Sequence, residues 1–397
     1  MDIRILPCKL QGNIAAIPSK SQAHRLLICS AFADKETRLI CPDTNRDIEA
    51  TANCLRALGA DIARTVDGYL VKPIVRVPQT AILNCEESGS TLRFILPIVG
   101  ALGVDATLQM TGRLPYRPLS PLWEEMERMG CYLSRPTEHT IRCCGKLQSG
   151  DFQIDGGVSS QFITGLLFAC ALMDGESRIS IAGVLESKPY VDMTLDALKL
   201  FNMPVNDFTV SGGTFHSPGE ITVEGDWSNA AFFLAAKALG SDVIVENLNY
   251  ESSQGDMACA KLFTQLTENI TVSCSDIPDL VPILSVVAAA NNGAVFTNIR
   301  RLRLKESDRV ASVIAMLSAL GCHATATEDT LTIQPGKFTG GTVDACGDHR
   351  IAMSAAIAAT AAQAPVTILG AECVSKSYPG FWEEYKRLGG QYELNLR

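Results

Sequence analysis

The chain has 397 residues, of which 47% are hydrophobic and 19% charged, a balance typical of a soluble globular protein with two or three domains. Its formal net charge of −9 argues against nucleic acid or an anionic membrane as a partner, but leaves small anions open. The stretch "MDIRILPCKL" lacks the pattern of a signal peptide, and no apolar run is long enough to predict a membrane span.

One pattern recurs along the chain. An apolar run with helical period ends at a Gly-like stop and is followed by two strand-like segments around a tight turn, with "VDG", "EHT" and "SGG" as turn tips. The stops fall near positions 59, 130, 202, 267, 321 and 390. This period is too long for a solenoid, so each repeat is predicted to be an α/β module.

Six modules divide naturally into two lobes of three. Between them, "EGDWSNA" predicts a hinge, with Asp226 or Ser228 as the cap of the next helix. A ligand cleft is expected between two similar lobes.

The first predicted helix follows "IPSKSQAHRLL". Ser19 or Ser21 can cap it, and Lys20 and Arg25 next to free backbone N–H groups suit an anion. Taken alone, a surface helix with two solvated cations explains the stretch better.

The next two segments combine arginines with small or rigid residues. In "CEESGSTLRF", Gly89 precedes a buried helix whose first turn holds Arg93, so either an anion binds there or Arg93 pairs with Glu86 or Glu87. In "TGRLPYRPLSP", prolines stiffen the backbone around Arg117, which suits a bidentate anion contact, although a plain loop arginine is the simpler explanation.

Two hydroxyl-rich helix starts follow. "GGVSSQFIT" offers Ser159, Ser160 and Gln161 to phosphate or hydroxyl groups, or merely caps a helix. "LESKPYVDMT" adds Ser187 and Tyr190.

The last third of the chain carries most of the remaining charges of interest. "SDIPDLVPIL" places Asp279 before a very apolar helix, as a helix-start charge or as a base. "LRLKESDRV" puts Lys305 and Arg309 at i, i+4 of a predicted helix start, where like charges repel unless a partner lies between them. Arg350 in "GDHRIAMSAA" and Lys376 in "VSKSYPGF" are further cations.

Taken together, at least six helix starts carry Lys or Arg next to small hydroxyl residues in an otherwise acidic chain. Cations are normally favoured at helix C-termini, whereas acidic Glu306 and Asp308 suit an N-terminus. The set therefore predicts a strongly anionic ligand with several phosphate or carboxylate groups.

Other chemistries are not supported. The 14 cysteines form no C-x-x-C pair and lie among apolar residues, which predicts buried thiols in a reducing cytoplasm. The five histidines form no metal-binding pair, and neither a P-loop nor a dinucleotide fingerprint occurs.

Nine motifs, in this order, give the chain a family resemblance that covers nearly its whole length: "SKSQAHRLLICSAFA", "ESGSTLRF", "YRPLSPL", "SSQFITGLL", "ESKPYVDMT", "IPDLVP", "LKESDRV", "DHRIAMSAA" and "SKSYPGFW". The chain resembles the 5-enolpyruvylshikimate-3-phosphate (EPSP) synthases. The resemblance implies an α/β fold of two lobes, each with three βαβαββ repeats in an inverted barrel. Residues 1–19 with 228–397 would form one lobe and 20–227 the other, with hinges near 19–21 and 225–230.

The same resemblance implies the reaction. The enolpyruvyl group of phosphoenolpyruvate moves to the 5-hydroxyl of shikimate 3-phosphate, and phosphate is released, on the route to chorismate and the aromatic amino acids. It implies no metal or organic cofactor, small-molecule partners only, a cytoplasmic location and no need for more than a monomer.

Residue roles follow from matched positions. Asp279 would be the base for the 5-hydroxyl, Glu306 would exchange protons at the methylene carbon, and Lys20 would touch both substrates, while Arg93 and Asp308 would be structural. The shikimate 3-phosphate ligands would be Lys20, Ser21, Arg25, Ser159, Ser160, Gln161, Ser187, Tyr190, Asp279 and Lys305. The phosphoenolpyruvate ligands would be Lys20, Gly89, Arg117, Gln161, Arg309, Arg350 and Lys376.

The chain departs from many family members at two positions. Glu87 replaces an Asn in the glycine loop, where an acid next to an anion pocket is unexpected unless it points at a cation, and Arg301 replaces another Asn. The related transferase that acts on UDP-N-acetylglucosamine is the nearest alternative, but its loop cysteine is absent from "TGRLPYRP". A non-catalytic relative would be expected to lack Asp279 or Glu306.

Overall fold

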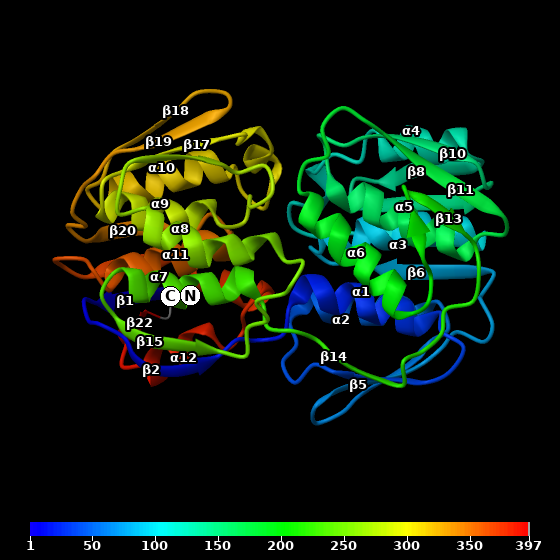
Figure 1. Ribbon diagram of the computed structural model, residues 1–397, viewed down its shortest axis with the longest axis horizontal. Helices are drawn as coiled ribbons and strands as arrows, with labels where there is room; N and C mark the ends of the chain where they lie inside the picture. Colours follow the sequence, from blue (N-terminus) through cyan, green and yellow to red (C-terminus); the bar gives the residue numbers. More distant parts are fainter. Residues whose placement is uncertain (396–397) are drawn as a thin grey trace. The chain divides into compact units, whose positions relative to one another are not determined.

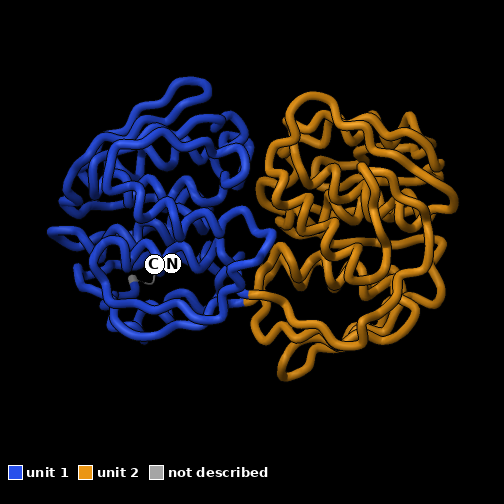
Figure 2. The backbone as a smooth tube through the Cα atoms, in the orientation of Figure 1, with its two compact units in different colours: residues 1–17, 225–397 blue, residues 18–224 orange. Residues whose placement is uncertain are grey.

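The computed structural model describes residues 1–395 and separates into two compact units (Figure 2). Unit 2 comprises Pro18–Glu224, and unit 1 comprises Met1–Ile17 together with the chain from Gly225 onward. Unit 2 is thus inserted into the sequence of unit 1. Movement at the expected hinges, 19–21 and 225–230, stays a prediction.

Unit 2 contains three four-stranded sheets that share one topology, in which the first two strands are parallel and the other pairs antiparallel. In strand order they are β14 (Glu220–Thr222), β3 (Thr37–Ile40), β5 (Gly68–Lys72) and β4 (Asp61–Arg64); β6 (Thr80–Asn84), β7 (Asp105–Gln109), β9 (Thr140–Gly145) and β8 (Cys131–Thr137); and β10 (Asp151–Asp155), β11 (Glu176–Ala182), β13 (Thr209–Ser211) and β12 (Val205–Asn206). The helices are α1 (Lys20–Ala31), α2 (Arg46–Ala57), α3 (Gly89–Leu102), α4 (Leu122–Arg128), α5 (Ser160–Leu172) and α6 (Lys188–Leu200), with a 3-10 turn η1 (Leu114–Tyr116).

Unit 1 repeats that topology in two sheets and reduces it to one parallel pair in the third. The sheets are β16 (Ile270–Ser273), β17 (Ala294–Thr297), β19 (Thr330–Ile333) and β18 (Ala324–Ala326); β20 (Gly341–Asp344), β21 (Val366–Leu369), β1 (Asp2–Leu6) and β22 (Gln391–Asn395); and β15 (Asp242–Glu246) with β2 (Gln11–Ala15). The helices are α7 (Trp227–Ala238), α8 (Cys259–Gln265), α9 (Val281–Ala290), α10 (Arg309–Ala319), α11 (His349–Ala359) and α12 (Phe381–Arg387), with 3-10 turns η2 (Gly255–Ala258), η3 (Arg300–Leu304) and η4 (Ala371–Lys376). The predicted α/β fold of repeated modules is confirmed.

Most of the predicted helix stops are left-handed residues. Gly59, Gly130, Asn202 and Gly321 have φ of 111°, 107°, 61° and 86°, while the last stop lies at Gly389 (φ 92°), one residue before the predicted position. The stop predicted at 267 has no such residue. In that module α8 ends at Gln265, and the following turn needs no positive φ.

One predicted turn was wrong. The hairpin between β12 and β13 turns at Asp207 and Phe208, whose φ values are 47° and 56°, rather than at "SGG". Two successive left-handed residues fit the twist of a two-residue hairpin. Gly212 is needed instead because its Cα packs against the backbone carbonyl of Met173.

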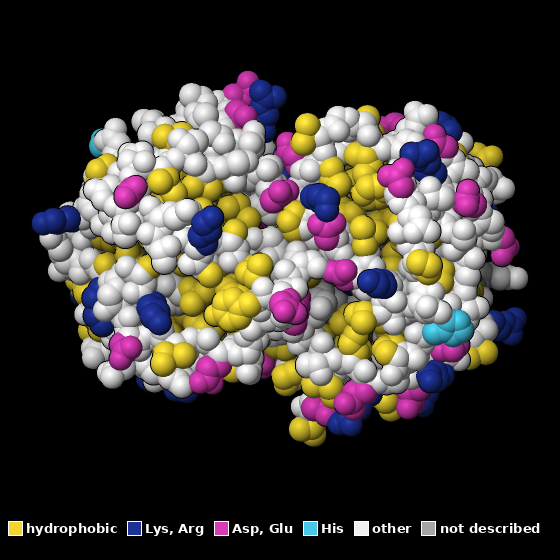
Figure 3. Space-filling model, viewed as in Figure 1, with side chains coloured by type: hydrophobic (Ala, Val, Ile, Leu, Met, Phe, Trp, Pro, Cys, Tyr) yellow, Lys and Arg dark blue, Asp and Glu magenta, His cyan; other side chains and the backbone are white. Residues whose placement is uncertain are grey.

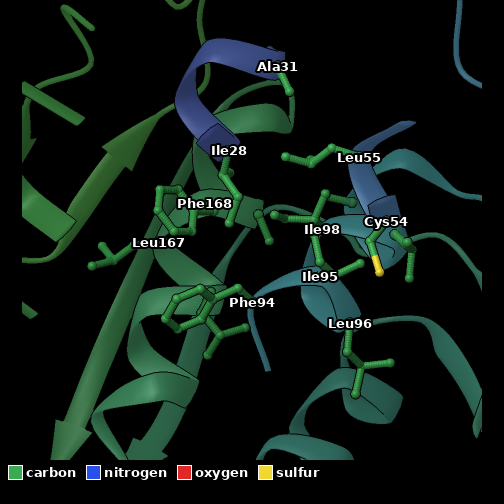
Figure 4. Close-up of a cluster of buried hydrophobic side chains, with 14 of the residues drawn as sticks. Ile28, Ala31, Cys54, Leu55, Phe94, Ile95, Leu96, Ile98, Leu167 and Phe168 are labelled. Carbon is green, nitrogen blue, oxygen red and sulfur yellow. The ribbon is translucent and has the colours of Figure 1, made fainter. Parts of the chain in front are cut away.

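The long helices lie toward the inside of each unit and the sheets toward its outside (Figure 1). All 11 residues of α11 and 12 of the 14 residues of α3 are buried. A helix that is apolar on all sides is expected only where neighbours cover it completely. Figure 4 shows a cluster of buried hydrophobic side chains in unit 2. Ile28 of α1, Leu55 of α2, Ile95 of α3 and Phe168 of α5 all contribute to it.

The cysteines behave largely as predicted. All 14 are free thiols, and ten of them are buried, whereas Cys346 is exposed. Within the described chain, no helix combines the length and the apolarity needed to cross a membrane.

Helices α3 and α5 pack closely at the backbone carbonyl of Arg93. Pro97 has no N–H, so the carbonyl of Arg93, four residues earlier, lacks its usual helical hydrogen bond. Gly165 of α5 packs against this carbonyl, and a Cβ at position 165 would overlap Arg93 O and lie 3.0 Å from Pro97 Cγ.

We therefore expect Gly165→Ala to destabilise the protein by about 1–3 kcal/mol, because overpacking forces the two helices apart. Urea unfolding followed by circular dichroism measures the change. The control is Gly380→Ala, because a Cβ at position 380 would meet nothing within 4 Å. Equal stability of the two variants would contradict this account of the α3–α5 contact.

Candidate active site

Lys20 is the first residue of α1, and the Ser19 side chain caps that helix by accepting a hydrogen bond from Gln22 N. Lys20 Nζ donates to Asp47 Oδ2 at 2.9 Å, and both side chains are largely buried. Asp47 lies in the first turn of α2, where a carboxylate is also favoured by the helix dipole. Its position in "TNRDIEA" is that of an ordinary helix-start acid, so sequence reasoning missed its pairing with Lys20.

Arg25 is almost fully buried, and its contacts join α1 to α5 and α6. Its Nε donates to Thr194 Oγ1 at 2.9 Å, Nη1 donates to the carbonyl of Ser21 at 2.7 Å, and Nη2 donates to the carbonyl of Tyr190 at 2.6 Å. The predicted residues Ser21, Arg25 and Tyr190 are therefore brought together.

The glycine loop before α3 is surrounded by guanidinium groups. Ser88 caps α3 by accepting from Thr91 N at 3.2 Å. A Cβ on Gly89 would stand 2.6 Å from Arg117 Nη1 and 2.7 Å from Arg93 Nη1, so glycine allows both guanidinium groups to lie close to the loop backbone. Arg93 is anchored on the carbonyl of Pro118 at 3.0 Å, which ties α3 to the segment that carries Arg117.

Gln161 joins this group from α5. Its Oε1 accepts from Arg93 Nη1 at 3.2 Å, and its Nε2 donates to Ser90 Oγ at 3.0 Å. The structure thus gathers Gly89, Arg117 and Gln161 around one loop.

Glu87 lies in the same loop, and its side chain packs against the segment that follows β7. Its carboxylate lies against the backbone of Gly112, which has φ 56° and leaves no room for a side chain. The backbone N of Thr111 also donates to the carbonyl of Glu86 at 2.8 Å. The backbone hydrogen bond of Glu86 joins the two loops, and the Glu87 side chain packs at the same place.

The two hydroxyl-rich helix starts are neighbours. Ser159 caps α5 by accepting from Gln161 N at 3.3 Å, and Ser160 is the first residue of that helix. Ser187 precedes α6 with a left-handed φ of 54°. The backbone N of Glu186 donates to the carbonyl of Gly156 at 3.2 Å, which holds the two starts side by side.

In unit 1, three carboxylates converge on Arg309, whose side chain is 1% exposed. Its Nε donates to Asp348 Oδ2 at 2.8 Å, Nη1 to Asp279 Oδ1 at 2.6 Å, and Nη2 to Glu306 Oε2 at 2.6 Å. Each of the three guanidinium nitrogens therefore donates to a carboxylate, and a buried arginine requires such anionic acceptors.

Asp279 also binds other cations. Arg350 Nη2 lies 3.0 Å from Asp279 Oδ2, and Lys305 Nζ lies 3.5 Å from Oδ1. Burial, the largest influence, raises the pKa of Asp279, but Arg350, Lys305 and Arg309 together outweigh it and hold the pKa well below its usual range. In this arrangement Asp279 is a weak base.

Lys305 has the opposite perturbation. Burial is the main cause and lowers the pKa of its ammonium to about 8, although the charge of Asp279 opposes this change. The neighbouring charges of Arg309 and Arg301 lower the pKa further, and that of Glu306 raises it.

The expected i, i+4 pairing of Lys305 with Arg309 was wrong. Helix α10 begins at Arg309, and Asp308 caps it by accepting from Ala311 N, so residues 305–308 are not helical. Lys305 directly follows η3. The two cations meet at Asp279 because the non-helical "KES" segment turns back toward it.

The other predicted cations differ in their surroundings. Arg350, in the first turn of α11, is 4% exposed, and its Nη1 donates to the carbonyl of Asp279 at 3.3 Å. Lys376 is half-buried at the end of η4 rather than at a helix start. Arg301, one of the departures from the family pattern, donates through Nη2 to the carbonyl of Ser275 at 2.9 Å.

A buried acid that sequence reasoning missed lies near this cluster. Asp256 accepts a hydrogen bond from Ser228 Oγ, while its Oδ1 has no hydrogen-bond partner among the described residues. Burial, followed by the charge of Asp279, raises the pKa of Asp256 to about 7. Only its three-dimensional neighbours mark it, because "QGDMA" is an unremarkable turn.

Comparison with known proteins adds the family. Residues 6–385 match the sequence model of a family described as EPSP synthase (3-phosphoshikimate 1-carboxyvinyltransferase). The chain belongs to the EPSP synthase family. The family's enzyme of that name from Clostridium kluyveri is 36% identical over 421 residues, covering 98% of each chain. The one from Clostridium perfringens is 38% identical over 416 residues, covering 97% of this chain and 98% of that protein.

Solved structures agree on the fold. An EPSP synthase from Acinetobacter baumannii superposes with a TM-score of 0.81 at 24% identity, covering 99% of this chain and all of that one. The enolpyruvyl transferase NikO from Streptomyces tendae gives a TM-score of 0.75 at 15% identity, covering 99% and 98%. The predicted two-lobe enolpyruvyl transferase fold is confirmed.

The predicted activity is confirmed by the family. As an EPSP synthase, the chain is a 3-phosphoshikimate 1-carboxyvinyltransferase of the shikimate pathway. It transfers the enolpyruvyl group of phosphoenolpyruvate to the 5-hydroxyl of shikimate 3-phosphate and releases phosphate.

The pKa of Lys305 leads to a prediction. Below pH 8 its ammonium is charged and pairs with Asp279, whereas above pH 8 the pair is lost. We expect kcat/KM to fall by about tenfold per pH unit above pH 8, because Lys305 is predicted to contact shikimate 3-phosphate as a cation. In Lys305→Arg this decline should move to higher pH, since a guanidinium stays protonated.

Initial-rate pH profiles measure this effect. Lys72→Arg is the control, because Lys72 forms an exposed pair with Asp61 and should leave the profile unchanged. An unshifted alkaline decline in Lys305→Arg would exclude Lys305 as its source.

Proposed function

We propose that the two units divide the work of the transfer. Unit 2 would hold shikimate 3-phosphate through Lys20, Ser21, Arg25 and the hydroxyl-rich helix starts. Unit 1 would supply the groups that move protons. The observation that carries the proposal is that Asp279 and Glu306 both pair with Arg309, while Lys305 pairs with Asp279.

The chemistry needs two kinds of proton transfer. In the addition step, the 5-hydroxyl oxygen bonds to C2 of phosphoenolpyruvate as it loses its proton, and C3 gains a proton to become a methyl group. In the elimination step, the bond from C2 to the phosphate oxygen breaks, C3 returns a proton, and the enol ether and phosphate are formed. We assign the hydroxyl proton to Asp279 and the C3 proton to Glu306, two carboxylates that lie on separate Arg309 nitrogens.

Asp279 needs activation for this role. Its pKa is depressed by Arg350, Lys305 and Arg309, so it binds a proton poorly while those cations surround it. Anionic substrate groups that draw some of these cations away would raise the pKa of Asp279 and make it a stronger base. Substrate binding and base activation are then one event.

Phosphoenolpyruvate would be held by cations of both units and by the glycine loop, and Lys20 and Gln161 would contact it as well. The proposed residues are Gly89 and Arg117 of unit 2 and Arg309, Arg350 and Lys376 of unit 1. Placing two anions together is costly, and these cations offset the repulsion. Hinge movement at 19–21 and 225–230 would bring both sets to the same substrates.

We further propose that the enzyme acts as a cytoplasmic monomer. The 14 free thiols are compatible with a reducing compartment. On the face drawn in Figure 3, acidic and basic side chains are interspersed, as expected for a protein whose partners are small molecules.

The assignment of roles is tested by steady-state release of phosphate from phosphoenolpyruvate with shikimate 3-phosphate. We expect Asp279→Asn and Glu306→Gln each to lower kcat by about 10²–10⁴-fold, because a positioned acid or base contributes that much. Glu328→Gln serves as the control, because Glu328 forms an exposed pair with Arg300.

The outcomes are distinct. Turnover only with UDP-N-acetylglucosamine as acceptor would contradict the assigned acceptor. Near-normal turnover of Asp279→Asn or Glu306→Gln would remove that residue from the mechanism without affecting the family assignment.

A further inference from the structure

Asp348 is a fully buried carboxylate at the start of α11, with 0% exposure. Its Oδ1 accepts from the backbone N of Arg350 at 3.0 Å and thereby caps the helix. Its Oδ2 accepts from Arg309 Nε at 2.8 Å and from Ser307 Oγ at 3.1 Å. One side chain thus fixes α11, α10 and the "KES" segment between η3 and α10.

A comparison within the chain shows that capping alone does not explain this residue. The loop from β6 to α3 in unit 2 has the same construction as the loop from β20 to α11. In the first, Asn84 Oδ1 accepts from Glu86 N at 3.0 Å, and in the second, Asp344 Oδ1 accepts from Cys346 N at 2.7 Å.

The caps of the two helices occupy matching places. Ser88 N donates to the carbonyl of Cys85 at 2.9 Å, and Asp348 N donates to the carbonyl of Ala345 at 2.9 Å. A neutral hydroxyl caps α3, although serine and aspartate are similarly good caps. Capping of α11 therefore does not require the negative charge of Asp348. The charged group that pairs with this carboxylate is Arg309.

The three partners of Arg309 are not equivalent. Asp348 is sealed from solvent, whereas the side chains of Asp279 and Glu306 are 18% and 16% exposed. Asp279 and Glu306 are thus partly accessible to a ligand, whereas Asp348 is not.

We infer that Asp348 is a positioning residue that fixes the Nε edge of Arg309, so that the two η nitrogens form a rigid fork on which a substrate carboxylate exchanges with Glu306 and Asp279. The inference rests on the proposed role of Arg309 in holding phosphoenolpyruvate. Exchange of one carboxylate for another keeps the buried guanidinium paired throughout, which avoids the large cost of an unpaired buried charge. It also releases Glu306 for proton exchange.

The test is Asp348→Asn, which keeps a capping oxygen but removes the charge. Loss of one charge-assisted hydrogen bond should raise KM for phosphoenolpyruvate by about 10- to 100-fold. KM for shikimate 3-phosphate should stay within about twofold, because eight of the ten residues assigned to that substrate belong to unit 2 and not to the fork. Asp344→Asn is the matched control, an exposed aspartate in the same segment that should change neither constant.

A second readout does not require turnover. The Nε–H signal of Arg309 in ¹⁵N spectra of the substrate-free protein should move in Asp348→Asn and not in Asp344→Asn. A wild type without activity would refute the proposed function, whereas an unmoved Nε–H signal in a folded Asp348→Asn would refute this inference alone.

Two more variants guard against misfolding. Asp348→Ser reproduces the cap of α3 and should show the same rise in KM for phosphoenolpyruvate. Ser307→Ala keeps both charges and removes one hydrogen bond to Asp348, so a rise of about 2- to 10-fold is expected. Folded variants with KM values equal to that of Asp344→Asn would overturn the inference.

Discussion

Side-chain capping of buried helix N-termini is the interaction on which the candidate site depends. The first N–H groups of a helix have no partner within it, and burying them unpaired would be costly. Among residues 1–395, seven helices have such a side-chain oxygen as the acceptor, from Ser19, Asn45, Ser88, Ser159, Asp226, Asp308 and Asp348. Lys20, Gly89, Ser160 and Arg309 each follow a cap directly, so their backbones are fixed before any ligand is bound.

The repeat and the helix starts could be read from the sequence, because both are local. Five of the six predicted stops lie at or next to residues with positive φ, and the α/β module was correctly inferred from helix, stop and hairpin. The errors were also local. "SGG" looked like a turn because glycine tolerates one, although the chain turns at Asp207 and Phe208.

The pairing of charges could not be predicted, because it depends on distant residues. Cations at helix starts suggested an external anion, yet the structure gives Lys20 the carboxylate of Asp47 and gives Arg309 those of Asp279, Glu306 and Asp348. Both explanations of these cations hold together if an anionic ligand replaces the internal carboxylates when it binds. The family resemblance named the residues. Only the three-dimensional arrangement shows that the pKa of Asp279 and the pKa of Lys305 are both lowered by their surroundings.

The insertion of unit 2 into unit 1 has a consequence for biosynthesis. Strand β2 pairs with β15, and β1 pairs with β21 and β22, all of which follow unit 2 in the sequence. The first and last residues of unit 2 lie close together, because Ser19 N donates to the carbonyl of Glu224 at 2.8 Å. On the ribosome, unit 2 is therefore complete while β1 and β2 still lack partners. The first strands to be synthesised are among the last to find their sheets, and their exposed edges are where nascent chains are most open to chaperones and to aggregation.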